Sequence, residues 1–155
     1  MTRGRPVLAA VLAALTGAAA GASAQDPRQQ HTPDPAIADG SAQRALDRAK
    51  RTWRRTGITT YRFRVRRVCF CPPATRGPVT LTVRRGRPVR APDEFGHVAT
   101  LPRLHRVVRE AIAEGAAELD VRYDRRGIPV EVFVDSRRRI IDEETGYAVD
   151  RFRRG

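Results

Sequence analysis

The stretch Tyr61-Arg62-Phe63-Arg64-Val65 decides the fold, because large apolar residues alternate in it with arginines. Side chains of a β-strand point alternately to opposite faces of a sheet, so this period of two predicts a strand with one buried face. Tyr61, Phe63 and Val65 are expected to face a core. The opposite face is expected to carry a row of positive charge formed by Arg62, Arg64 and Arg66.

The alternation changes phase beyond this stretch, because Val68 is apolar where the pattern calls for arginine. One extra residue in a strand produces such a slip, so we expect a bulge at Arg66-Arg67. Later segments also have strand character, namely 79–84, 88–91, 119–123, 130–134 and 147–152. Pro88 lacks a backbone N–H, which limits the segment 88–91 to a sheet edge.

Two segments have the 3.6-residue period of amphipathic helices. The first begins at Ser41, a residue suited to cap a helix, includes Trp53 in its apolar stripe, and stops near Gly57. The second begins at Thr100 and ends at Gly115. The turn-like connections between strands favour antiparallel hairpins. We therefore predict an α+β fold in which one antiparallel sheet of about five strands has both helices on one face and water on the other.

The first 24 residues predict export. Arg3 and Arg5 precede a stretch without charge from Val7 onward, and Ala22-Ser23-Ala24 follows as a small-x-small cleavage site. This order is typical of a secretory signal peptide, and the apolar stretch is shorter than the ~20 residues of a membrane span. We predict a signal peptide over 1–24, a disordered proline-containing spacer over 25–40 and a single domain over 41–155. The mature chain, with no transmembrane span, is expected outside the cell or in the cell envelope.

The chain is strongly basic. Its formal net charge is +13, of which Arg3 and Arg5 carry two, so the mature chain has +11. Almost all of this charge is arginine, since Lys50 is the only lysine. Positive charge attracts polyanions and anionic surfaces, which at a cell envelope are wall polymers, lipid head groups and acidic glycans. Nucleic acid is a disfavoured partner, because no aromatic residue shares the arginine-bearing face of the 61–66 strand.

The candidate anion-binding site consists of the arginines at alternate positions of the first strand and one from the next segment: Arg62, Arg64, Arg66 and Arg84. Guanidinium groups bind phosphate, sulfate and carboxylate through two parallel hydrogen bonds. The alternative is a solvated face on which these arginines pair across strands with Asp120, Glu131 and Asp135. The supply of carboxylates favours this alternative.

Cys69 and Cys71 are the only cysteines, and an even number in an exported chain points first to a disulfide. In an extended strand their Cα atoms lie about 6.6 Å apart, the upper limit of what a disulfide spans, so the backbone has to bend between them. Four roles stay open: a structural disulfide at the strand end, a redox-active pair in a strained small ring, a thiolate site for Cu(I), and pairing between chains. No further metal ligand is evident, and no cofactor is expected.

Several segments in succession resemble a known family. They are Tyr61-Arg-Phe-Arg-Val65, Cys69-Phe70-Cys71-Pro72, Val121-Arg-Tyr123-Asp124, Gly127-Ile-Pro129, Asp142-Glu143-Glu144 and Gly146-Tyr147. From about Ala42 to Phe152 the chain resembles the bacterial secreted family catalogued as domain of unknown function 6174, and the Cys-Phe-Cys-Pro segment is its most specific element. The resemblance implies the α+β architecture and export, and it implies no activity, cofactor or site residue.

The sequence contains no assembled catalytic set. The mature part has two serines, neither in a nucleophile elbow, and His105 lies at the edge of an apolar stripe, which predicts a structural role for it. We therefore expect a non-enzymatic exported domain that binds an anionic envelope polymer or another protein. The alternatives are a thiol-disulfide redox protein that uses Cys69 and Cys71, and an inhibitor or chaperone-like module. The oligomeric state does not follow from the sequence.

Overall fold

The computed structural model describes residues 32–69, 71–72, 77–136 and 144–155. The predicted signal peptide over 1–24 lies outside these residues. The elements, with η3 a 3-10 helix, are in chain order α1 (Pro35–Ala38), α2 (Ser41–Arg55), β1 (Tyr61–Val68), β2 (Val79–Arg84), β3 (Arg87–Arg90), η3 (Asp93–Val98), α3 (Leu101–Glu114), β4 (Glu118–Tyr123), β5 (Pro129–Asp135) and β6 (Glu144–Arg154).

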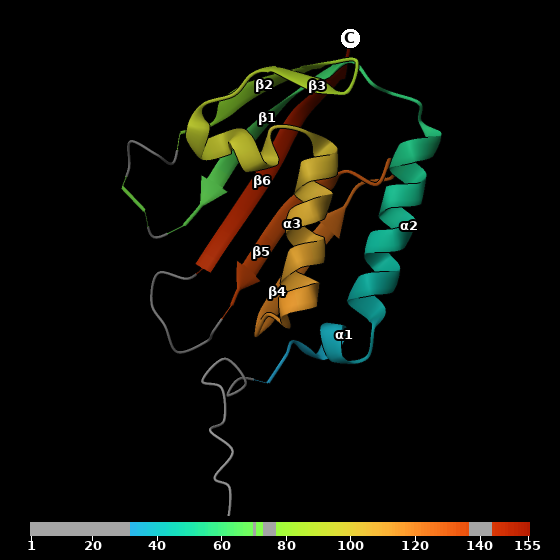
Figure 1. Ribbon diagram of the computed structural model, residues 1–155, viewed down its shortest axis with the longest axis vertical. Coiled ribbons are helices and arrows are strands. Elements are labelled where there is room, and N and C mark those ends of the chain that lie inside the picture. The colour runs from blue at the N-terminus through green and yellow to red at the C-terminus, as the bar shows by residue number, and fades with distance from the viewer. Residues whose placement is uncertain (1–31, 70, 73–76, 137–143) are drawn as a thin grey trace, which may run out of the picture.

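The described strands form one antiparallel sheet in the order β3-β2-β1-β6-β5-β4. The predicted fold class is confirmed, with six strands in place of about five. In Figure 1, β6 lies between β1 and β5, although it follows every other described strand in the chain. The helices lie on one side of the sheet (Figure 1). We call the opposite side, which no described helix covers, the open face.

The core lies between the sheet and the helices, and β1 forms its centre. The side chains of Tyr61, Phe63 and Val65 are at most 3% exposed, and Phe63 pairs across strands with the fully buried Leu81. Burial of one such side chain contributes about 1.5–3 kcal/mol to the free energy of unfolding. Trp53 of α2 packs edge-on against Tyr61, with ring centroids 5.4 Å apart. The prediction that Trp53 belongs to the core is confirmed.

The helix ends agree in part with the sequence. Thr100 caps α3 by accepting a hydrogen bond from the Arg103 backbone N–H, and Gly115 ends this helix in a left-handed conformation, as predicted. Ser41 was expected to cap α2, but Gly40 is the N-cap, and the Ser41 hydroxyl donates to the Ala36 carbonyl instead. In the described part of the chain, the helices are too short and too polar to cross a membrane.

The expected spacer over 25–40 is only partly described, and its described part differs from the expectation. Pro35–Ala38 forms the short helix α1. The Asp34 carboxylate accepts hydrogen bonds from the backbone N–H groups of Ala36 and Leu119, and the Asp34 N–H donates to the Ala116 carbonyl. These bonds fix residues 34–38 against the start of β4, so the ordered domain begins before residue 41.

The bulge expected at Arg66-Arg67 is wrong. Pairing of β1 with β6 is regular from Arg64 to Val68, and the register shifts instead between Arg62 and Arg64. The extra residue lies in β6, where Arg151 has φ +49°. Val68 keeps its place on the open face at the end of the strand, 47% exposed, so an apolar side chain in water explains the pattern without a slip.

The turn between β4 and β5 packs directly against α2. At Gly127, with φ +78°, an added Cβ would come within 2.1 Å of the Ala49 carbonyl oxygen. Only glycine allows both the left-handed backbone and this approach. Gly57 also has a positive φ, +63°, but an added Cβ there would meet nothing within 4 Å.

We expect Gly127→Ala to lower the free energy of unfolding by about 2–5 kcal/mol, because a left-handed backbone and overpacking both penalise the new methyl group. Urea denaturation of residues 25–155 measures this loss. The matched control is Gly57→Ala, for which only the backbone penalty of about 1–2 kcal/mol is expected. Equal losses in the two variants would show that the turn does not press on α2.

Candidate functional site

The predicted anion-binding arginines lie on the open face. Within β1, the core-facing residues are buried, whereas Arg62 and Arg66 are exposed and Arg64 is half-buried. Arg84 ends β2 on the same side of the sheet, since Leu81 and Val83 of that strand point into the core. The alternation of β1 and β2 therefore brings the four arginines to one surface.

Neighbouring strands add arginines to this surface that the sequence did not assign to it. Arg153 of β6 lies directly opposite Arg62, and Thr82, on the other side of Arg62, pairs with Arg90 of β3. Arg84 lies directly opposite Arg87. We call the whole set the arginine face, which consists of Arg62, Arg64, Arg66, Arg84, Arg87, Arg90 and Arg153.

Most of the arginine face lacks a carboxylate partner. Within the described part of the chain, Arg62, Arg84, Arg87, Arg90 and Arg153 form no ion pair. Like charges directly opposite each other on neighbouring strands destabilise a sheet. The pairs Arg62–Arg153 and Arg84–Arg87 are therefore unfavourable for folding, and their positive charge is available to an external anion.

Arg64 is the exception. Its Nε donates to Asp150 Oδ1 at 2.6 Å and its Nη2 donates to Oδ2 at 2.5 Å. These hydrogen bonds lower the pKa of Asp150, and they raise the pKa of Arg64. The sequence suggested other partners for these arginines. Of those, Glu131 binds Arg122, at 3.1 and 2.5 Å, on the far side of the open face.

A hollow of about 290 Å³ lies beside the Arg64–Asp150 pair on the open face. It is lined by Arg64 and Arg66 from β1, by Pro78 just before β2, and by Ala148 and Asp150 from β6. Ala148 lies opposite Arg66, and its small side chain leaves the space above the sheet empty. Two guanidinium groups thus border one cavity.

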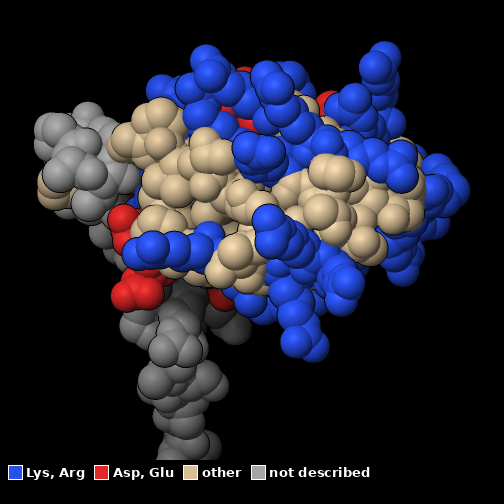
Figure 2. Space-filling model, turned by 90° about the horizontal axis from the view of Figure 1, so that it is seen from above, with Lys and Arg blue, Asp and Glu red and all other residues tan. Residues whose placement is uncertain are grey.

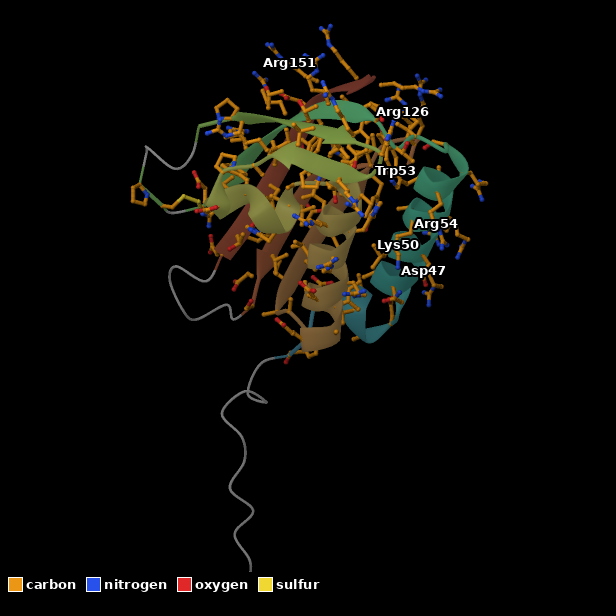
Figure 3. The ribbon with its side chains drawn as sticks, turned by 45° about the horizontal axis from the view of Figure 1, so that its top comes forward. Asp47, Lys50, Trp53, Arg54, Arg126 and Arg151 are labelled. Atoms are coloured by element: carbon orange, nitrogen blue, oxygen red, sulfur yellow. A yellow bond between two sulfur atoms is a disulfide. The ribbon has the colours of Figure 1, made fainter. Side chains whose placement is uncertain are left out.

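Basic residues also crowd the end of the molecule where β1 begins and β6 ends. Figure 2 looks onto this end and shows Lys and Arg side chains around most of its margin, with acidic side chains in a few small groups. Arg151 and Arg126 lie at this end, and Arg54 projects from the outer side of α2 (Figure 3). The guanidinium carbon of Arg126 lies 5.3 Å from the ring centre of Phe152 in β6. The arginine face reaches this basic end at Arg153, next to the last residue of β6.

The two cysteines lie at the other end of β1. Cys69 and Cys71 form a disulfide, with their Cα atoms 5.2 Å apart, and both residues are half-buried. The backbone bends as the bridge requires. Seven residues of extended strand separate Cys69 from Arg62, which is about 23 Å. The structure does not bring the two predicted sites together.

The two described histidines, His97 and His105, make contacts within the fold. His105 is 3% exposed, and its Nε2 donates to the Gly127 carbonyl at 2.8 Å, which ties α3 to the β4–β5 turn. Burial lowers the pKa of His105. His97 lies in η3, and its Nε2 is 2.5 Å from the hydroxyl of Tyr147. Among the residues that the structure describes, no three His, Cys, Asp or Glu side chains are grouped to hold a metal ion.

Comparison with known proteins gives one match. A scan against protein-family models matches residues 45–154 to the family described as "Family of unknown function (DUF6174)". The matched range runs from the first turns of α2 to the end of β6 and so includes the arginine face. Searches of curated proteins and of solved structures find no match.

The opposed charges give a direct test of the site geometry. Arg153→Glu would place a carboxylate opposite Arg62, so we expect a higher urea midpoint at low salt and a smaller gain at about 1 M salt, where charges are screened. Arg153→Gln removes repulsion without adding attraction, so we expect a smaller rise at low salt. A fall in the midpoint with Arg153→Glu would mean that the two side chains do not face each other.

Proposed function

Since this chain belongs to DUF6174, a family of unknown function, we propose a function from its own residues: it is a non-enzymatic exported domain that binds an anionic partner at the cell envelope. The binding surface is the arginine face. The observation that carries the proposal is the pair of opposed arginines, Arg62–Arg153 and Arg84–Arg87, which lack carboxylate partners among the described residues.

An external anion relieves the electrostatic cost of this surface. Repulsion between neighbouring guanidinium groups opposes folding, and a bound oxyanion between them turns that repulsion into attraction to a shared partner. Arginine is suited to this role because its planar group donates two parallel hydrogen bonds to phosphate, sulfate or carboxylate. The arginine face thus supplies both the positive charge and the hydrogen-bond donors by which a protein binds an oxyanion.

The proposed location follows from the sequence and agrees with the cysteine chemistry. Residues 1–24 have the order of a secretory signal, and disulfides persist in oxidising compartments outside the cytosol. The Cys69–Cys71 bridge suits such a compartment. The anionic partners there are polymers and lipid head groups, so we propose an envelope polymer as the partner in preference to another protein.

Retention on an anionic polymer tests the binding role. We expect the mature chain to bind immobilised dextran sulfate and to elute as salt rises, because each arginine–anion contact releases counterions. Arg62→Gln combined with Arg153→Gln removes two contacts, so the slope of log affinity against log salt should fall by roughly two.

The matched control removes the same charge from α3, on the covered side of the sheet. Arg106→Gln combined with Arg109→Gln lowers the net charge equally, and both residues are exposed. We expect this variant to keep most of the retention. If both double variants lose retention equally, net charge alone causes the binding, and if salt has no effect, the proposal is wrong.

A second candidate function is thiol-disulfide exchange. It is favoured by the closed bridge between Cys69 and Cys71, which encloses one residue and is partly exposed. A substrate thiolate would attack one sulfur, break the Cys69–Cys71 bond and form a mixed disulfide. A second substrate thiolate would then release the oxidised substrate, leaving two protein thiols, so that two electrons pass from substrate to protein.

Oxidation of a test dithiol measures this activity. If the protein is a redox protein, the wild type oxidises a reduced peptide dithiol stoichiometrically, and Cys71→Ser loses the activity because the bridge no longer forms. The Arg62→Gln, Arg153→Gln variant should oxidise the dithiol normally, since its changes lie at the other end of β1. A wild type that leaves the dithiol reduced rules this function out.

A further inference from the structure

Arg64 differs from the other residues of the arginine face because it binds an internal carboxylate, that of Asp150. We infer that Arg64, Arg66 and the adjoining hollow form a phosphate-binding subsite, and that the Asp150 carboxylate occupies its guanidinium donors until a phosphate group displaces it. This inference rests on the proposed function and names the chemical class of the anion and the group with which it competes.

The geometry of the pair is that of an oxyanion complex. Asp150 accepts from both Nε and Nη2 of Arg64, so the two oxygens of one carboxylate match the two parallel donors of one guanidinium. Two oxygens of a phosphate group match the same donors. The carboxylate is therefore the chemical stand-in for a ligand at this position.

The local charge favours an anion with more charge than a carboxylate. Three arginines lower the pKa of Asp150: Arg64 most strongly, through its hydrogen bonds, and then Arg151 and Arg66 through their charges. One carboxylate thus faces three guanidinium groups and leaves positive charge uncompensated. Phosphate monoesters and inorganic phosphate carry between one and two negative charges at neutral pH, more than a carboxylate, which suits this excess.

The hollow provides room for the exchange. Its volume of about 290 Å³ is at the lower end for ligand pockets, which indicates space for a phosphate and a small attached group. The Asp150 side chain is 55% exposed, so its carboxylate can turn toward water without unpacking the core. Exposed ion pairs contribute little to stability, so opening this one costs little.

The same face contains an internal comparison. Arg122 and Glu131 form an ion pair with the same two-bond geometry between β4 and β5. There a second carboxylate, Asp120, also acts on Arg122, so negative charge exceeds positive charge locally. Removal of either carboxylate, Asp150 or Glu131, raises the net charge by one, but only Asp150 borders the arginine-lined hollow.

The test compares Asp150→Asn with Glu131→Gln in the mature chain, titrated with inorganic phosphate and followed by amide chemical shifts. We expect Asp150→Asn to bind phosphate about tenfold more tightly than the wild type, because the substitution frees one charge-assisted donor group. We expect the phosphate affinity of Glu131→Gln to stay within about twofold of the wild-type value. Arg64→Gln combined with Asp150→Asn should lose the gain. Urea midpoints of all variants confirm that each one is folded.

The outcomes separate this inference from the proposed function. If the wild type binds dextran sulfate but Asp150→Asn and Glu131→Gln have equal phosphate affinities, the subsite is wrong and the binding role stands. If the wild type binds neither dextran sulfate nor phosphate, and Asp150→Asn gains no phosphate affinity, both are wrong. A gain with Asp150→Asn supports the subsite even where dextran sulfate fails to bind.

The source of the phosphate group is settled by two further probes, soluble polyphosphate and vesicles that contain phosphatidic acid, whose head group is a phosphate monoester. Tighter binding of Asp150→Asn to polyphosphate alone supports a polymer ligand, and tighter binding to vesicles alone supports a lipid head group. If neither probe binds Asp150→Asn more tightly than Glu131→Gln although inorganic phosphate does, the ligand is free phosphate and both larger sources are excluded.

Discussion

The alternation of side chains along β1 is the constraint on which the core and the arginine face both depend. Tyr61, Phe63 and Val65 are buried because the helices cover that side of the strand. The alternate residues Arg62, Arg64 and Arg66 must then point to the opposite side of the sheet. Core and charged surface are two faces of one strand, so a change of register would exchange them and destroy both.

The arginine face consequently opposes folding while the core favours it. The opposed pairs Arg62–Arg153 and Arg84–Arg87 are tolerated because β1 and β2 bury large apolar side chains on their other face. Asp150 relieves the repulsion at only one point, beside Arg64. Proteins usually keep such a destabilising arrangement only at functional sites, and this is why the arginine face is the candidate binding surface.

Local patterns in the sequence were sufficient for the two long helices and the strands, but not for α1, for η3 or for the order of strands in the sheet. The period of two places Arg62, Arg64 and Arg66 on one face, and Thr100 and Gly115 mark the ends of α3, since these signals act over a few residues. Asp150 and Arg153 join the site only because β6 inserts beside β1, and no local signal encodes that pairing. Val68 is apolar but exposed on the open face, and the prediction of a bulge from this apolar residue is therefore wrong.

The place of β6 in the sheet has a consequence for the order of assembly. Residues 86 positions apart, Arg64 and Asp150, meet across the central strand pair, and without β6 the strands β1–β3 and β4–β5 form two halves with no shared hydrogen bonds. Synthesis from the amino end supplies the joining strand after both halves. The sheet is therefore completed only when β6 is available, and its pairing with the distant β1 is the kind of non-local contact that slows folding.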